Sequence, residues 1–317
     1  MNSFRLPFFT ALKSAKRVLV AGAGGGFDVF SGLPLYFNLH AAGKQVFLAN
    51  LTFSNLPPKT AGRHITPELV EVTADSVGSE HYFPEKQLSQ WFRDQGKEVP
   101  IYTFHRTGPA PIAVAYRALV DELKLDTVIL VDGGTDSLMR GDEEGLGTPQ
   151  EDMTSIAAVS QLQIPRKLLV CLGFGIDAFH DVCHSQVLEA IAELIQSRGY
   201  LGAFSLMQEM PEVQKFREAT EYVLARTPDR ISIVCTSILS ALQGKFGDVH
   251  ATDRTWGSEL YINPLMAFYW CFNLQQVAER VLYLDGIMNL EGYGQLSDFI
   301  ARFHRERMTR RRRSLPM

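Results

Sequence analysis

The chain has 317 residues, of which 46% are hydrophobic and 21% are charged, and its formal net charge is −4. This apolar content is enough for one large globular domain, which excludes a disordered protein. The charge gives no reason to expect specific nucleic-acid binding, and no run reaches the ~20 apolar residues of a membrane span. The four cysteines are far apart in sequence and form no C-x-x-C pair, so we expect a protein of the reduced cytoplasm.

Short β-rich runs alternate with helical periodicity along most of the chain. The predicted strands are 17–21, 45–49, 100–104, 127–131, 167–172, 200–204, 230–234 and 281–284. The predicted helices are 27–41, 86–95, 110–124, 151–162, 181–197, 212–225, 264–279 and 292–306. Because several strands are continuous apolar runs, this alternation predicts a Rossmann-like α/β fold, with a mostly parallel sheet and helices on both faces.

No long linker and no internal repeat divides the chain. We therefore expect a single α/β domain over residues 1–304, with loop insertions at 132–150 and 243–262. Residues 305–317 form a basic tail in which positions 310–313 are all arginine, and we expect this tail to be solvated and disordered. A weak contact with an anionic partner or a membrane surface is the alternative for the tail.

Four glycines within five residues follow the first predicted strand. Because glycine has no Cβ and a helix N-terminus attracts anions, Gly24, Gly25, Gly26 and Asp28 are candidates to bind the anionic or sugar part of a ligand. A tight turn without a ligand is the alternative. Phe27 occupies the place of the third glycine in a dinucleotide fingerprint, and the acid expected after the second strand is absent, which argues against NAD(P).

The loop after the strand predicted at 127–131 combines glycines with many carboxylates. Within 21 residues stand Asp132, Asp136, Asp142, Glu143, Glu144, Glu151 and Asp152, five glycines and a single cation, Arg140. Hard oxygen ligands suit Mg²⁺ or Ca²⁺, so we expect Asp132 and Asp136 to be metal ligands if the loop lines a cleft, with Gly133 and Gly134 beside the ligand. A ligand rich in hydroxyl groups and a solvated acidic loop are the alternatives.

The other carboxylates of this segment have simpler interpretations. Glu143 and Glu144 are expected at the loop surface. Thr148 followed by Pro149 and Glu151 has the form of a helix N-cap, so Glu151 is discounted as a catalytic residue.

The turn after the strand predicted at 167–172 supplies a third set of polar residues. Asp177 is expected to be the N-cap of the next helix, with His180 and His184 one turn apart on that helix. We expect Asp177, His180 and Asp136 to carry acid/base chemistry, His180 being neutral near the helix N-terminus. Joint chelation of a transition metal by the two histidines, and a capped helix without a ligand, are the alternatives.

Two later segments are candidates for a lid and for a subunit contact. The polar stretch at 243–262 could fold back over the site and bring Lys245, His250 and Arg254 to an anionic substrate. Residues 264–272 are apolar nearly all round, which predicts a helix buried in the core or at a homo-oligomer interface.

The glycine turn, the Asp-Gly-Gly-Thr-Asp-Ser motif at 132–137 with residues 140–143, and the turn at 173–177 together resemble a prokaryotic family catalogued only as a domain of unknown function. The resemblance extends over most of the chain. It implies an α/β fold and carries no activity with it.

The carboxyl ends of parallel strands meet at one edge of a sheet, so the three loops are expected to form one site. We predict a small-molecule enzyme, a hydrolase or transferase, that acts on a nucleotide, a nucleoside or a related phosphorylated or ribose-bearing substrate. The alternatives are a non-catalytic nucleotide-binding sensor that signals through residues 264–272, and an NAD(P)-dependent oxidoreductase.

Overall fold

The structure, a computed structural model, describes residues 5–57, 61–79, 81–227 and 230–315. In these residues nine strands form one sheet, in the order β3-β4-β5-β2-β1-β6-β7-β9-β8. The strands are β1 Arg17–Gly22, β2 Gln45–Leu51, β3 Arg63–Thr66, β4 Leu69–Val72, β5 Ile101–Phe104, β6 Thr127–Asp132, β7 Arg166–Leu172, β8 Tyr200–Ser205 and β9 Phe268–Asn273.

The middle of the sheet is parallel and its two sides are antiparallel. Strands β5, β2, β1, β6 and β7 pair in parallel, whereas β3, β4, β8 and β9 add antiparallel pairs. The sheet is therefore mixed, and the expectation of a mostly parallel sheet holds only for its core. The chain runs outward from β1 to β2 and β5, then returns to β6, so the direction of winding reverses between β1 and β6. Ligands of open α/β sheets bind beyond the carboxyl ends of the strands at such a reversal.

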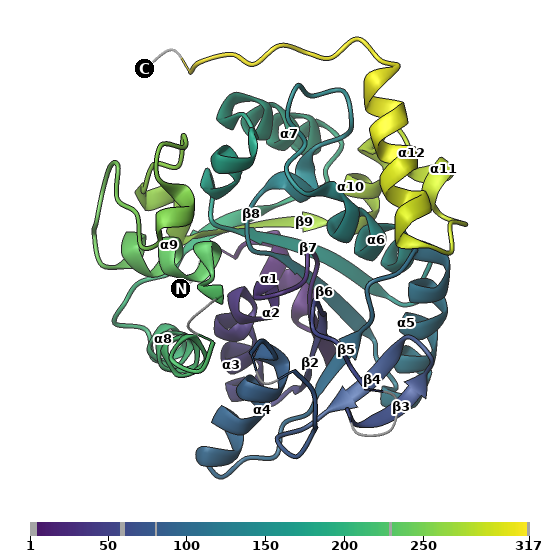
Figure 1. The fold of residues 1–317 in the computed structure, drawn as a ribbon, viewed down its shortest axis with the longest axis vertical. Helices are drawn as coiled ribbons and strands as arrows, with labels where there is room; N and C mark the ends of the chain where they lie inside the picture. Colours follow the sequence, from purple (N-terminus) through teal and green to yellow (C-terminus); the bar gives the residue numbers. More distant parts are fainter. Residues whose placement is uncertain (1–4, 58–60, 80, 228–229, 316–317) are drawn as a thin grey trace.

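Helices pack on the two faces of the sheet (Figure 1). One face carries α5 Pro109–Leu123, α6 Pro149–Ser160, α7 His184–Gln196, α10 Leu274–Arg280, α11 Leu284–Ile287 and α12 Tyr293–Arg305. The other carries α1 Pro7–Leu12, α2 Asp28–Ser31, α3 Leu33–Ala41, α4 Pro84–Asp94, α8 Pro211–Leu224 and α9 Ile233–Leu242. A hydrophobic core lies on each face of the sheet, and alternate side chains of β1 pack into them. Leu19 packs on the face that carries α6, and Val18 and Val20 pack on the face that carries α3.

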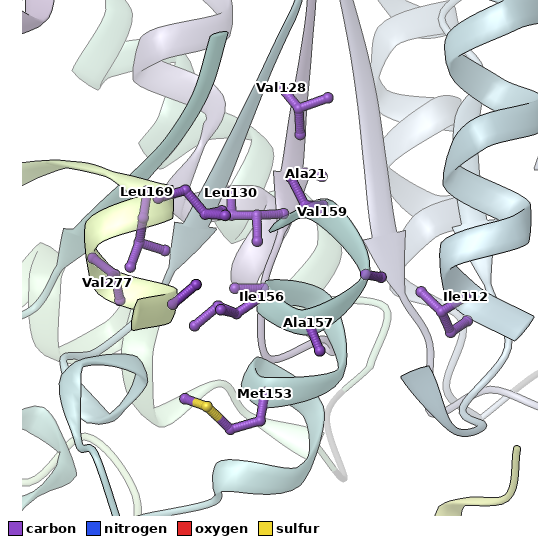
Figure 2. Packing of buried hydrophobic residues seen from close by; sticks show 14 of the residues in the cluster. Ala21, Ile112, Val128, Leu130, Met153, Ile156, Ala157, Val159, Leu169 and Val277 are labelled. Atoms are coloured by element: carbon purple, nitrogen blue, oxygen red, sulfur yellow. The ribbon is translucent and has the colours of Figure 1, made fainter. Parts of the chain in front are cut away.

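Helix α6 is buried on almost every side. Figure 2 shows Ile156 of this helix near Leu130 and Leu169 of the sheet, with Val277 of α10 and Ile112 of α5 on its two sides. Close packing of this kind leaves little room for movement. The first turn of α6, which carries Asp152, is therefore held firmly against the end of the parallel strands.

Three element predictions are wrong. The run 264–272 forms a short 3₁₀ turn, Pro264–Ala267, and the strand β9, which pairs with β7 and β8. Its aromatic residues favour a strand, and a strand paired on both sides cannot be the interface helix that we expected there. Residues 230–234 contain the start of α9, where the Ser232 hydroxyl accepts from the Cys235 N–H. Residues 281–283 form the turn before α11, which begins at Leu284.

The sequence also gave no indication of helix α1 or of the hairpin β3–β4, whose strands are only four residues long. In the described part of the chain, no helix has the length and apolar character needed to cross a membrane.

The basic segment after α12 runs past α7 (Figure 1), and acidic residues hold it at Arg310 and Arg312. Arg310 pairs with Asp142 and Glu143, each at 2.8 Å, and also with Glu189. Glu143, expected at the surface, is fully buried and also accepts from the Gly141 N–H at 2.8 Å. Because a buried carboxylate needs a partner, Arg310 binds this loop where a solvated tail was expected.

Candidate functional site

A cavity of about 790 Å³ lies at the carboxyl ends of β1, β6 and β7. Residues from the three predicted loops line it together: Gly24, Gly25, Gly26, Asp28, Asp132, Gly133, Asp136, Asp177 and His180. Gly134 packs directly against the Asp177 carboxylate. The loops that the sequence placed at one edge of the sheet thus meet around a single cavity.

Three buried carboxylates gather at one point of this cavity. Asp28, Asp132 and Asp152 are 8%, 3% and 2% exposed, and one oxygen from each lies within 4.8 Å of the others. Among the described residues, the Oδ1 atom of Asp152 has no hydrogen-bond partner. This Asp28/Asp132/Asp152 triad is an arrangement that could hold a divalent cation, since such ions take oxygen ligands.

Each member of the triad is positioned by a different element. Asp28 begins α2, and its Oδ2 accepts from the Gly24 N–H at 2.7 Å. Asp132 ends β6 and accepts from the N–H of Ser137 at 3.2 Å and from the Ser137 hydroxyl. Asp152 lies in the first turn of α6, where the helix dipole favours a negative charge.

The glycines of these loops make room for carboxylates. A Cβ atom at Gly24 would lie 2.8 Å from Asp28 Oδ2, and a Cβ at Gly133 would lie 2.7 Å from Asp28 Oδ1. Side chains at Gly134 and Gly147 would collide with other site carboxylates in the same way. Because these glycines have no Cβ, acidic side chains approach the backbone closely. Our prediction placed the ligand in this space, and the structure places the protein's own carboxylates there.

Burial and mutual repulsion disfavour the charged form of these acids. Burial is the main cause that raises the pKa of Asp28, Asp132, Asp152 and Asp177 well above the usual value, and neighbouring carboxylates raise it further. The pKa of Asp136 is also raised, again chiefly by burial. The site must therefore hold protons or another positive charge.

Asp177 and His180 are placed differently from our expectation. Both belong to a 3₁₀ turn, Ile176–His180, and α7 begins only at His184, so Asp177 is not its N-cap. His180 ends this turn and His184 begins α7, so the two histidines do not share one helical face, and His184 packs against Phe174. Asp177 Oδ2 accepts from the Thr135 N–H at 2.6 Å, and burial is the main cause that lowers the pKa of His180.

The N-cap predicted at Thr148 does not form a capping bond. The Thr148 hydroxyl and N–H donate to Asp136 Oδ2 at 3.1 and 2.8 Å instead. Glu151 lines the cavity and accepts from the Tyr293 hydroxyl at 2.8 Å. Burial is the main cause that raises its pKa. Because its side chain lines the cavity, Glu151 belongs to the candidate site.

Three arginines, Arg106, Arg230 and Arg254, supply positive charge to the cavity wall. Of the three basic residues expected in a lid, only Arg254 lines the cavity among the described residues. His250 is hydrogen bonded to Asp248 at 2.6 Å and to Thr255 at 2.7 Å, within its own loop.

The sequence alone did not identify several of these residues as part of the site. Asp152 was counted among the crowded carboxylates of its segment but was given no role in the site. Arg106 and Arg230 had no signal in the sequence, since only the tertiary fold brings them to the cavity. Glu85 is also buried, accepts from Asn50 Nδ2 at 2.8 Å, and has its pKa raised to about 7 by burial.

Comparison with known families gives one result. Residues 62–300 match the model of a family described as "Protein of unknown function (DUF1152)". The matched region contains two members of the triad, Asp132 and Asp152, and begins after Asp28. No curated protein matches the chain.

Proposed function

The chain belongs to the DUF1152 family of proteins of unknown function, and from the geometry of its site we propose that it is a metal-dependent hydrolase or transferase. Its substrate is a nucleotide, a nucleoside or a related phosphorylated or ribose-bearing small molecule. The Asp28/Asp132/Asp152 triad is the observation on which this proposal depends.

The triad fits a divalent cation such as Mg²⁺ or Ca²⁺ in three respects. Its donors are all carboxylate oxygens, it is buried, and Asp152 Oδ1 has no other partner among the described residues. A bound ion would offset the repulsion between the carboxylates and, in reactions of this class, would polarise a phosphoryl oxygen or a water molecule. Of the two metal ligands predicted from the sequence, Asp132 belongs to the triad, and Asp136 lies next to it.

The remaining residues of the cavity would orient the substrate and move protons. His180, with its lowered pKa, is neutral at physiological pH and can accept a proton. Asp136 and Asp177 are held by Thr148 and Thr135 and border the reacting group.

The position of the cavity supports the proposal. The parallel strands follow the order of a Rossmann-like sheet, with the cavity at the point of reversal between β1 and β6. We therefore extend the observed α/β fold to a Rossmann-like assignment, in which Gly24, Gly25 and Gly26 border the bound ligand.

A screen of nucleotides, nucleosides and sugar phosphates, each with Mg²⁺, Ca²⁺ or EDTA, tests the proposal. We expect turnover of at least one compound that EDTA abolishes, together with a higher melting temperature in the presence of metal. Stabilisation by a nucleotide without any turnover would favour the sensor, and stabilisation by NAD or NADP alone would favour the oxidoreductase. Turnover that is equal in EDTA and in metal would contradict the metal-dependent mechanism.

A further inference from the structure

The cavity has a second region that is positive rather than acidic. Residues 230–234 line it at the start of α9, and Arg254 lines it from the loop that follows α9. Arg254 donates to the carbonyl of Ile231 at 3.4 Å, which ties the two segments together. Among the described residues, neither Arg230 nor Arg254 has a carboxylate within ion-pairing distance.

The glycine turn that we expected to hold an anion has few donors to offer. The Gly24 N–H donates to Asp28, and the Gly26 N–H donates to the Leu51 carbonyl at 3.0 Å. The helix that follows is only four residues long and begins with Asp28, whose carboxylate would repel an anion. An anionic group of the substrate must therefore be bound elsewhere in the cavity.

The start of α9 has free donors. The first N–H groups of a helix have no partner within that helix, and here those of Ile233 and Val234 belong to residues that line the cavity. Ser232 caps the next donor by accepting from the Cys235 N–H at 3.1 Å. Backbone donors at a helix start and arginine side chains together make an environment that attracts phosphate.

This positive region adjoins the triad. A Cβ atom at Gly133 would lie 2.7 Å from Asp28 Oδ1 and 2.7 Å from Val234 Cγ1, so the triad and the start of α9 contact the same glycine. A group bound between them would meet a metal ion on one side and arginines on the other. A phosphoryl group, which has several charged oxygens, can satisfy both at once.

We propose that Arg230, Arg254 and the first turn of α9 form a phosphoryl-binding subsite next to the triad. This inference rests on the proposed function, and it narrows the substrate to phosphorylated molecules. Nucleosides and other ribose-bearing compounds without a phosphate are then excluded as full substrates.

Calorimetric titration with inorganic phosphate and with pyrophosphate, in the presence of Mg²⁺, tests the subsite. Arg230→Met and Arg254→Met should each weaken the binding of both anions at least about tenfold, since each removes a charged donor. Arg226→Met is the matched control. Arg226 is exposed just after the end of α8, stacks on Tyr222 and does not line the cavity, so the Arg226→Met variant should bind both anions as the wild-type protein does.

The outcomes separate this inference from the proposed function. Unchanged anion affinity in both arginine variants, or no anion binding by the wild-type protein, would overturn the subsite even if the protein turns over a substrate in a metal-dependent way. The rise in melting temperature with Mg²⁺ alone should be the same in both variants as in the wild type. Loss of that rise would show that the arginines support the fold of the site, which would also overturn the subsite.

Discussion

The Asp152→Asn variant should no longer be stabilised by Mg²⁺ and should lose turnover roughly 100-fold or more. Asp152 supplies the unpartnered oxygen of the triad, and an amide is a much weaker ligand for Mg²⁺ than a carboxylate. For the wild-type protein, Mg²⁺ at 100 times its dissociation constant should add about 2.7 kcal/mol to the free energy of unfolding. Thermal melts with EDTA or Mg²⁺, together with turnover rates, measure both effects.

Without metal, the same variant should be at least as stable as the wild-type protein. Burial, and then the neighbouring carboxylates, disfavour a charge on Asp152, and a neutral amide avoids both costs, so only the response to metal is lost. Asp121→Asn, on the exposed side of α5, is the control and should keep the full response. If Asp152→Asn melted at a higher temperature in Mg²⁺ by the same margin as the wild type, the triad would not be the metal site.

The metal-free protein should become less stable as the pH rises from 7 to 8. The pKa values of the site aspartates are raised in the folded state, and that of Glu85 is raised to about 7, so the folded protein retains protons that the unfolded chain has released. Raised pKa values of acids give stability that is lost as the pH rises through them. The loss is about 1.4 kcal/mol per pH unit for each retained proton, and urea unfolding in EDTA measures it.

Other titratable groups change the free energy of unfolding mainly outside the range from pH 7 to 8. His105, His180 and His184 have lowered pKa values, so they reduce stability only as the pH falls through about 6.5. Saturating Mg²⁺ should remove the part of the slope that comes from the triad. The Glu85→Gln variant should lose only the part that comes from Glu85, and should keep its response to Mg²⁺. Stability that is constant or increases between pH 7 and 8 without metal would show that the carboxylates are ionised in the folded state.

The parallel core of the fold could be predicted from the sequence, because β1, β6 and β7 contain continuous apolar runs that end in, or are followed by, glycine or aspartate. β9 was not, since an apolar run of nine residues has no periodicity that separates a buried strand from a buried helix. The hairpin β3–β4 was missed because strands of four residues carry too little pattern.

The sequence predicted where the candidate site lies but missed some of the residues that form it. Loops that follow parallel strands converge for topological reasons, and this brought Asp28, Asp132, Asp136 and Asp177 together as expected. Asp152 reaches the site from a helix, and its contribution depends on how α6 packs against the sheet. Arg254 was expected near the substrate from its polar loop, whereas Arg106 and Arg230 stand in segments with no recognisable pattern, so their positions could only be seen in the folded chain.

Crystals of the wild-type protein soaked in Mn²⁺, with data collected to locate anomalous scattering, test the central claim most directly. We predict one strong peak between the carboxylates of Asp28, Asp132 and Asp152, which disappears in crystals of Asp152→Asn. A cavity without a peak at these three side chains, or a peak that persists in the variant, would contradict the metal site and the function that we derive from it.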